Sequence, residues 1–232
     1  MRTMININEI EQAVTILRAG GLVAFPTETV YGLGADANNA VAVAKVFTAK
    51  GRPHDHPLIV HVASVAAVSD WAANVPEAAL KLAAAFWPGP LTMVFRKKPH
   101  VLSCVTGGQE TVAIRVPAHP MATALLEAFA GGLVAPSANQ FTHVSPTNAE
   151  AVTEELAGSV DLVLDGGECR VGVESTIVDM TSEIPRVLRP GMITVDQIEQ
   201  VLGQKVLRLQ PKSDMRVPGQ HLVHYAPRTK TI

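Results

Sequence analysis

Apolar positions at helical spacing mark the first segments of the chain. Ile10, Val14 and Leu17 recur on one helical face, with Asn8 before them and Gly20-Gly21 after them. This pattern predicts a helix that Asn8 caps and the two glycines end. The same spacing predicts further helices over residues 39–49, from Pro76 to about Trp87, and over 119–130. Capping-box patterns at Thr147/Glu150 and Thr194/Gln197 predict two more helix starts.

Short apolar runs between these helices predict strands of three to six residues. They are LVAF at 22–25, LIVHV at 58–62, LTMVF at 91–95, TVAIRV at 111–116, LVA at 133–135, DLVLD at 161–165, STIVDM at 175–180 and RVLRP at 186–190. Strands linked through helices favour parallel pairing, whereas the short connection between 162–165 and 175–180 predicts an antiparallel pair. We therefore expect an α/β fold with a twisted, open, mixed sheet flanked by helices.

Composition and charge narrow the classes of protein. The chain has 232 residues, 47% of them apolar, which is enough for one sizeable core. No apolar run approaches the roughly 20 residues of a membrane helix, and no signal-peptide pattern opens the chain, so we expect a soluble cytoplasmic protein without membrane contact. The formal net charge of −2 is unusual for a protein that coats nucleic acid, although a local basic groove remains compatible with it.

The two cysteines and the polar tail complete this outline. Cys104 and Cys169 are far apart and form no CxxC pattern, which favours two free thiols over a zinc site or a disulfide. The tail from Val206 is polar, contains prolines and lacks helical periodicity. We therefore predict a domain over residues 1–205 and a linker or clamp over 206–232.

Two loops carry the first candidate chemistry. PTETVYGLG at 26–34 follows a strand, and loops at strand ends are where α/β sheets bind ligands, although an ordinary turn fits equally well. It matches neither GxGxxG nor GxxxxGK[ST]. Lys50 and Arg52 bracket a glycine after a helix, which suits an anion between them, but two solvated cations at a helix C-terminus would look the same. His54, His56 and His61 lack the carboxylates that would complete a metal site.

Further polar groups follow other strands. Arg115 lies in an apolar strand and must find either a ligand anion or an internal carboxylate. Ser137, Asn139 and Ser145 follow the strand at 133–135, where they suit either a ligand or turn and cap chemistry. Ser175 and Thr176 enter a strand, and Arg189 precedes a Pro-Gly turn. These residues together predict an anion-binding cleft, and nothing resembles a catalytic triad.

The order of these motifs is more specific than any one of them. PTETVYGLG, KGRP with PLIVHV, WPGPLT, TVAIRVPAHP, APSAN, GVESTIVD and VLRPG resemble the YrdC-like family over about residues 5–205. The tail VPGQHLVHYAP resembles the linker of the longer, two-domain Sua-type members. We expect either a chain cut short before the second domain or a form that has the linker and no second domain. The resemblance implies a YrdC-like fold with a concave ligand cleft.

The resemblance also implies roles for individual residues. Lys50 and Arg52 would be catalytic. The nucleotide contacts would be Arg52, His56, Thr111, Ser137, Asn139, Ser145, Arg189 and the linker residue Tyr225. The threonine contacts would be Thr29, His61, Arg115 and Ser175. The sequence departs from the family at His56, where many members have asparagine before Pro57-Leu58.

The implied reaction joins threonine, bicarbonate and ATP into a threonylcarbamoyl adenylate for tRNA modification. Such a reaction gathers negative charge and needs positioning and electrostatic stabilisation, with Mg²⁺ on the phosphates. A downstream threonylcarbamoyl transferase would take the product, and RNA contact is compatible with the fold. Two alternatives stay open: a non-catalytic RNA-binding maturation factor, and a relative that adenylates a carbamoyl group.

Overall fold

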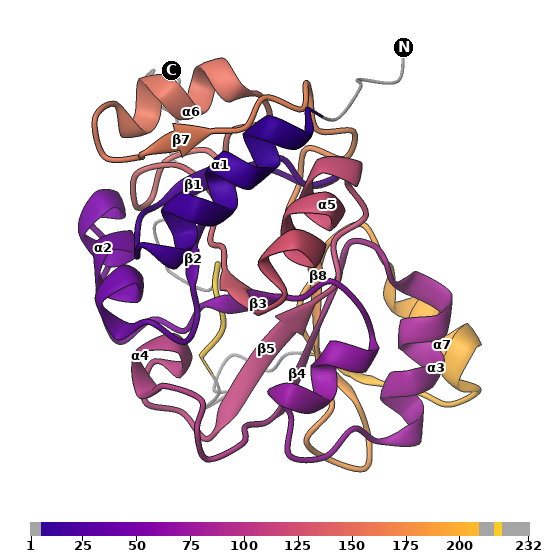
Figure 1. Ribbon diagram of the computed structural model, residues 1–232. Coiled ribbons are helices and arrows are strands. Elements are labelled where there is room, and N and C mark those ends of the chain that lie inside the picture. Colours follow the sequence, from indigo (N-terminus) through magenta and orange to yellow (C-terminus); the bar gives the residue numbers. More distant parts are fainter. Residues whose placement is uncertain (1–5, 209–215, 220–232) are drawn as a thin grey trace, which may run out of the picture.

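Ten strands form one mixed sheet in this computed structural model, which describes residues 6–208 and 216–219 (Figure 1). The strands are β1 (Val23–Phe25), β2 (Gly32–Asp36), β3 (Ile59–His61), β4 (Leu91–Arg96), β5 (Thr111–Arg115), β6 (Leu133–Val134), β7 (Leu162–Val163), β8 (Thr176–Asp179), β9 (Arg186–Arg189) and β10 (Leu207–Arg208). Their order across the sheet is β10-β9-β8-β4-β5-β3-β6-β2-β1-β7. The predicted open mixed sheet is confirmed.

The helices also follow the predicted segments, with small shifts at their starts. They are α1 (Ile7–Arg18), α2 (Ala40–Lys50), α3 (Glu77–Phe86), α4 (Ser103–Thr106), α5 (Pro120–Phe129), α6 (Ala149–Leu156) and α7 (Val195–Leu202), with a short 3-10 helix at Ala66–Asp70. The capping box at Thr194 is present. The caps predicted at Asn8 and Thr147 are wrong, because the Asn6 and Asn148 side chains accept the first-turn amide hydrogens instead.

One predicted strand pair is also wrong. β7 lies at one edge of the sheet and pairs parallel with β1, whereas β8 lies between β4 and β9. A short connection in sequence therefore crosses most of the sheet. Gly32, Leu33 and Gly34, at the end of the segment predicted to be a loop over 26–34, belong to the buried strand β2. A Cβ atom on Gly34 would come within 2.8 Å of the Phe25 ring, so glycine allows β2 to pack closely beside β1.

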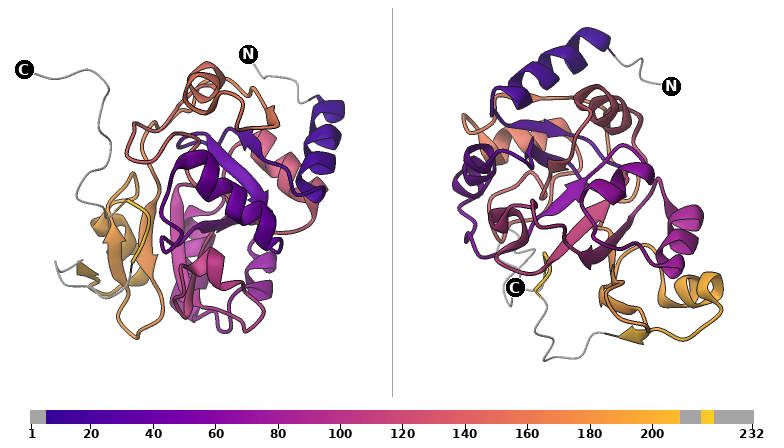
Figure 2. Two further views of the ribbon diagram at one scale, coloured as in Figure 1. Left: turned by 90° about the vertical axis from the view of Figure 1, so that its left-hand side faces the viewer. Right: turned by 60° about the horizontal axis from the view of Figure 1, so that its bottom comes forward.

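Alternating residues along each strand face two different layers. In β3 and β5 the even-numbered positions Val60, Val112 and Ile114 join the large core beneath α2, α3, α6 and α7, whereas in β4 the odd-numbered positions such as Met93 do so. On the other face α1 and α5 pack against β1, β6 and the segment that follows β7, and Figure 2 shows α1 at the opposite edge of the molecule from the 176–208 region. On the rest of that face, the apolar cluster contains no residue from any of the described helices, and Val217 packs there with Ile59 and Ala113. A cleft can form on this part of the sheet.

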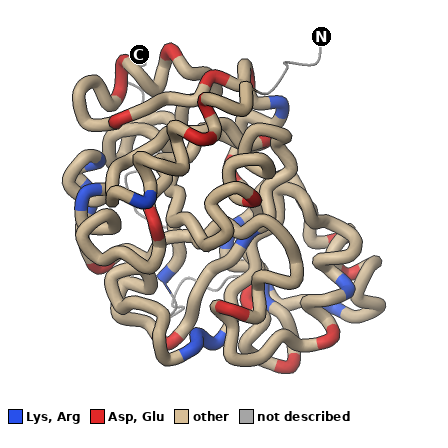
Figure 3. The backbone as a smooth tube through the Cα atoms, viewed as in Figure 1, with Lys and Arg blue, Asp and Glu red and all other residues tan. Residues whose placement is uncertain are grey.

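The charges and the helix lengths complete the picture. Lys and Arg are interspersed with Asp and Glu around the chain in Figure 3, as the small net charge suggests. Over residues 6–208 and 216–219, no helix has both the length and the apolar character that crossing a membrane requires.

Candidate functional site

A pocket opens on the part of the sheet that none of the described helices covers. Its cavity is small, about 50 Å³, and it is open to solvent. Three of its lining residues are arginines and one is a carboxylate, so it is locally cationic in a chain of net charge −2. The lining residues are Thr29, Val30, Arg52, Ile59, Arg115, Ala135, Pro136, Ser137, Glu174, Ser175, Arg189, Pro218 and Gly219. Six predicted site residues are therefore brought together: Thr29, Arg52, Arg115, Ser137, Ser175 and Arg189.

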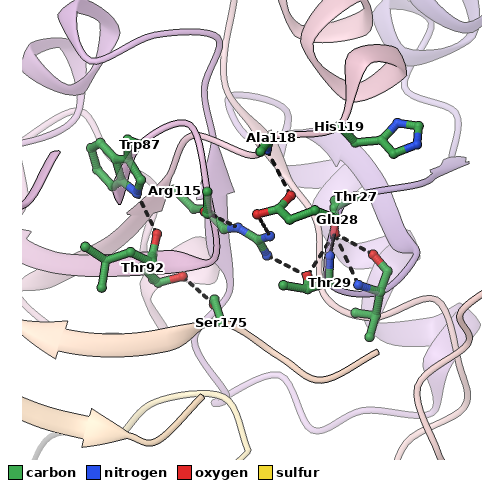
Figure 4. Close-up of polar contacts among 12 residues, drawn as sticks. Thr27, Glu28, Thr29, Trp87, Thr92, Arg115, Ala118, His119 and Ser175 are labelled. Carbon is green, nitrogen blue, oxygen red and sulfur yellow. Dashed lines mark hydrogen bonds and ion pairs between the residues drawn. The ribbon is translucent and has the colours of Figure 1, made fainter. Parts of the chain in front are cut away.

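Arg115 points to this face of the sheet because it lies two residues after Ala113 on β5, and alternate residues of a strand point to the same face. Its Nη2 donates to Glu28 Oε1 at 2.7 Å, and both side chains are buried. Nη1 donates to Thr29 Oγ1 at 3.0 Å and Nε to the Gly89 carbonyl at 3.3 Å (Figure 4). Of the two partners that the sequence allowed for Arg115, the internal carboxylate is therefore present as Glu28. Arg115 nevertheless also lines the pocket.

The loop that carries Glu28 is held by hydroxyl groups. Thr27 Oγ1 donates to the Val30 carbonyl at 2.7 Å and accepts from the amides of Thr29 and Val30. Because that donation uses its one hydrogen, the Thr29 hydroxyl must be the donor in the 2.8 Å contact between the two threonines. Thr29 therefore offers only lone pairs to its other neighbours, including Arg115.

Ser175 links the pocket to the strand beside it. Its hydroxyl lies 2.7 Å from Thr92 Oγ1 (Figure 4), and Arg189 donates to both its hydroxyl and its carbonyl. Arg189 Nη1 also donates to the Pro218 carbonyl at 3.0 Å. We call residues 216–219 the strap, because they lie against the sheet and contribute Pro218 and Gly219 to the pocket wall.

Lys50 and Arg52 are buried, so the reading of two solvated cations is wrong. Gly51 takes a left-handed conformation that ends α2 between them. Lys50 Nζ donates to the carbonyls of Ser137 and Asn139, which ties α2 to the loop after β6. Burial, and secondly the nearby Arg52, lower the pKa of Lys50 well below its usual value. Lys50 does not line the pocket itself.

Arg52 points into the pocket with an incomplete set of partners. Its Nη2 donates to the Pro57 carbonyl at 3.0 Å, and its buried Nε has no partner among the described residues. Burial, and then the charge of Arg189, lower its pKa to about 10, which leaves it protonated at neutral pH. Asn139 Oδ1 is likewise buried without a partner in the described part of the chain. Unpaired buried donors and acceptors are costly, and both favour a bound polar ligand.

His61 lies on the same strand face as Ile59, paired with Arg115 across β3 and β5. Burial first, and then the charge of Arg115, lower its pKa to about 3, so the ring is neutral. Its ring packs edge-on against Phe25, with 6.3 Å between centroids. It does not line the pocket.

The other predicted residues lie outside the pocket lining. Ser145 donates to Glu174 at 2.6 Å and so touches its rim, and His56 packs against Phe141. Thr111 lies on the face of Arg115 but four residues along β5, about 13 Å away by strand geometry. Tyr225 falls outside the described residues.

Sequence reasoning missed four residues that the structure gives clear contacts. They are Thr27, Glu28, Thr92 and Glu174. Glu28 had a signal, a carboxylate in a loop directly after a buried strand. Thr92 had none, because a threonine inside an apolar strand is ordinary. For the described ranges, no group of three or more His, Cys, Asp or Glu side chains could hold a metal ion.

Comparisons with known proteins show what the whole chain is similar to. A family model named Sua5_yciO_yrdC, described as "Telomere recombination", matches residues 15–191. Threonylcarbamoyl-AMP synthase of Pyrococcus abyssi is 45% identical, over all of this chain and 71% of that protein, and that of Bacillus subtilis is 48% identical, over 96% and 65%. The crystal structure of P. abyssi Sua5 complexed with L-threonine superposes with a TM-score of 0.93 at 45% identity, covering 98% of this chain and 68% of that one. The chain thus spans about two thirds of these relatives.

Proposed function

The chain belongs to the Sua5/YrdC family of threonylcarbamoyl-AMP synthases, and from this premise we propose that it is an L-threonylcarbamoyladenylate synthase. The reaction joins the threonine amine and bicarbonate into a carbamate, with loss of water. The carbamate oxygen then attacks the α-phosphate of ATP, and pyrophosphate leaves. The product would serve threonylcarbamoyladenosine formation in tRNA.

The observation that carries the proposal is the cationic pocket. Arg52, Arg115 and Arg189 line it together, against the single carboxylate of Glu174. The reaction brings a triphosphate, a carboxylate and a carbamate into one space, and buried guanidinium groups stabilise such charge more strongly than water does. The described part of the chain offers no assembled nucleophile and base, and this reaction needs none, because the substrate carbamate is the nucleophile.

We propose that the pocket divides by charge. Arg115 and Thr29, with the Glu28 carboxylate behind them, form a part with balanced charge, which suits a zwitterionic amino acid such as the threonine held by the P. abyssi relative. Ser175 belongs to this part in our assignment, and its hydroxyl also accepts a hydrogen bond from Arg189. Arg52, Ser137 and Arg189 form the part with excess positive charge, which suits phosphate groups. We assign threonine to the first part and ATP to the second, with Lys50 and Asn139 holding the loop between them.

Magnesium fits this arrangement as a companion of ATP. Mg²⁺ in ATP-using enzymes is held by phosphate oxygens, waters and one or two carboxylates. Glu174 is the carboxylate that lines the pocket and is the residue able to contact it. When bound, the ion would neutralise phosphate charge. We also propose that the protein acts in the cytoplasm, where a transferase would take the unstable product.

The test is pyrophosphate release from ATP and bicarbonate, measured with and without L-threonine. We expect release that depends on both threonine and bicarbonate, and loss of release in an Arg52→Ala variant that remains folded. Release that ignores threonine but requires carbamoyl phosphate would instead identify a carbamoyl-adenylating enzyme. Tight RNA binding without any release would identify a non-catalytic factor.

A further inference from the structure

Glu28 occupies a position that the proposed reaction does not by itself require. It is 5% exposed, lies in the loop after β1, and does not line the pocket. Its two oxygens have different partners: Oε1 accepts from Arg115 at 2.7 Å, and Oε2 accepts from the Ala118 amide at 2.9 Å (Figure 4). Ala118 precedes His119, which caps α5. Glu28 therefore joins the strand arginine to the start of a helix on the far side of the loop.

The backbone of the same loop is fixed on a third side. The Val171 amide donates to the Glu28 carbonyl at 2.9 Å, and the Gly172 amide donates to the Thr29 carbonyl at 3.0 Å. Thr27 closes the loop internally, as described above. Glu28 is thus held through its carboxylate by β5 and by Ala118 at the start of α5, and through its backbone by the segment before Ser175. The carboxylate therefore has little freedom to change its direction.

Arg115 takes its orientation from this carboxylate. A guanidinium group has five N–H bonds, and Gly89, Thr29 and Glu28 accept three of them. Within the described residues, one N–H on each terminal nitrogen is left without a hydrogen-bond partner, and Arg115 lines the pocket. Two N–H groups on adjacent nitrogens match the two oxygens of a carboxylate. The buried charge of Glu28 also cancels that of Arg115, so the wall suits a net-neutral amino acid better than an extra anion such as phosphate.

We propose that Glu28 is a positioning residue for the threonine carboxylate. It fixes the plane of Arg115 so that the remaining pair of N–H groups faces the amino acid, and it keeps this wall neutral so that phosphate is not drawn to it. The inference rests on the proposed function, because it takes threonine as the occupant of this wall. It makes Glu28 a determinant of substrate choice although Glu28 does not touch the substrate.

The test measures threonine binding to the full chain by calorimetry, without ATP, in the wild-type protein and in Glu28→Gln. The amide keeps the size of the side chain. Its NH₂ group, however, is a hydrogen-bond donor and must face another donor, either Arg115 or the Ala118 amide, so one of the two hydrogen bonds is lost. We expect the threonine Kd to rise about 10- to 100-fold, the effect of losing one charge-assisted hydrogen bond. The KM for ATP should stay within about twofold. Glu110→Gln is the control, because Glu110 is an exposed carboxylate that pairs with Lys97 outside the pocket lining.

Comparing two ligands distinguishes a positioning role of Glu28 from a general weakening of the pocket. Wild-type protein should prefer threonine to threoninamide, which has no carboxylate, and Glu28→Gln should lose most of that preference. Glu28→Asp keeps the charge but is one methylene too short to reach both partners, so it should lie between the two and serves if Glu28→Gln does not fold. Unchanged affinity and unchanged preference in folded Glu28 variants would overturn the positioning role. No threonine binding by the wild-type protein would instead overturn the proposed function.

Discussion

At the scale of single residues, His61 couples the site to pH. It is buried beside Arg115 and Phe25, and its pKa of about 3 lies below the value near 6.5 of an exposed histidine. Below pH 6.5 the unfolded chain therefore binds a proton that the folded chain does not. The free energy of unfolding should fall by about 1.4 kcal/mol per pH unit from pH 6.5 down to about 3.

Replacing His61 with leucine should remove this contribution. Between pH 6.5 and 5 the wild-type protein should lose about 2 kcal/mol more than His61→Leu, because only the wild-type unfolded state gains the proton. Urea unfolding at several pH values measures the difference. His54→Leu is the control, since His54 is exposed. Parallel pH profiles for wild type and His61→Leu would show that the buried ring does not titrate as inferred.

Arg52 should act mainly on the nucleotide half of the reaction. Its unpaired Nε and its position in the pocket predict that Arg52→Lys, which keeps the charge but lacks the planar fork, lowers kcat/KM for ATP by about 10²-fold. The KM for threonine should change much less. Steady-state pyrophosphate release with each substrate varied separates the two effects, and an equal loss for both substrates would contradict the assignment.

At the scale of elements, the C-terminus of α2 and the loop after β6 depend on one buried lysine. Lys50→Met keeps the aliphatic stem but loses both donations to the carbonyls of Ser137 and Asn139. We expect a loss of about 3 kcal/mol in unfolding free energy, since hydrogen bonds to charged groups contribute about 1.5–3 kcal/mol each and burial of the charge offsets part of this. The KM for ATP should rise because Ser137 lines the pocket.

A lysine on the same helix provides the matched control. Lys45 is exposed and donates to the Gly20 carbonyl at 2.7 Å, so Lys45→Met should cost about 1 kcal/mol or less and leave the KM for ATP unchanged. Thermal unfolding and ATP kinetics of the two variants give the comparison. Equal effects of the two substitutions would mean that Lys50 acts only through general stability.

Elements also show where sequence reasoning succeeds. The amphipathic spacing of helices such as α7 made them predictable because burial of one face imposes that spacing locally, and strands such as β5 were predictable as short apolar runs. β2 was not predictable, because its glycines are required by the close approach of the Phe25 ring on the neighbouring strand. The position of β7 was not predictable either, because it depends on pairing with β1. The same holds for the site. Arg115 stood out as a charge in an apolar strand, whereas its ties to Glu28 and Ala118 exist only in three dimensions.

At the scale of the whole molecule, the strap holds the open half of the sheet. Arg216 donates to Asp55 at 2.9 Å and to the Gly107 carbonyl at 2.7 Å, and its backbone exchanges two hydrogen bonds with the Gln109 side chain. Val217 is buried in the apolar cluster of β3, β5 and β8. These contacts bring together segments 107 and 161 residues apart from the strap in sequence and place Pro218 beside Arg189. A wall built this way should shield a reactive acyl adenylate from water.

Loosening the strap should therefore affect catalysis more than folding. A Val217→Ser, Arg216→Ala double variant loses an apolar side chain worth about 1–2 kcal/mol and hydrogen bonds worth about 1 kcal/mol each, all of them between the strap and the body. We expect the KM for ATP to rise about 10-fold and a larger share of the adenylate to be hydrolysed, measured as AMP released per pyrophosphate. Arg208→Ala on β10 is the control, because Arg208 is exposed and outside the pocket lining. Because the large core lies elsewhere in the sheet, the double variant should still fold, with a melting temperature lowered by roughly 6–15 °C. A variant with normal ATP affinity and normal product yield would show that the strap lies on the pocket without serving it.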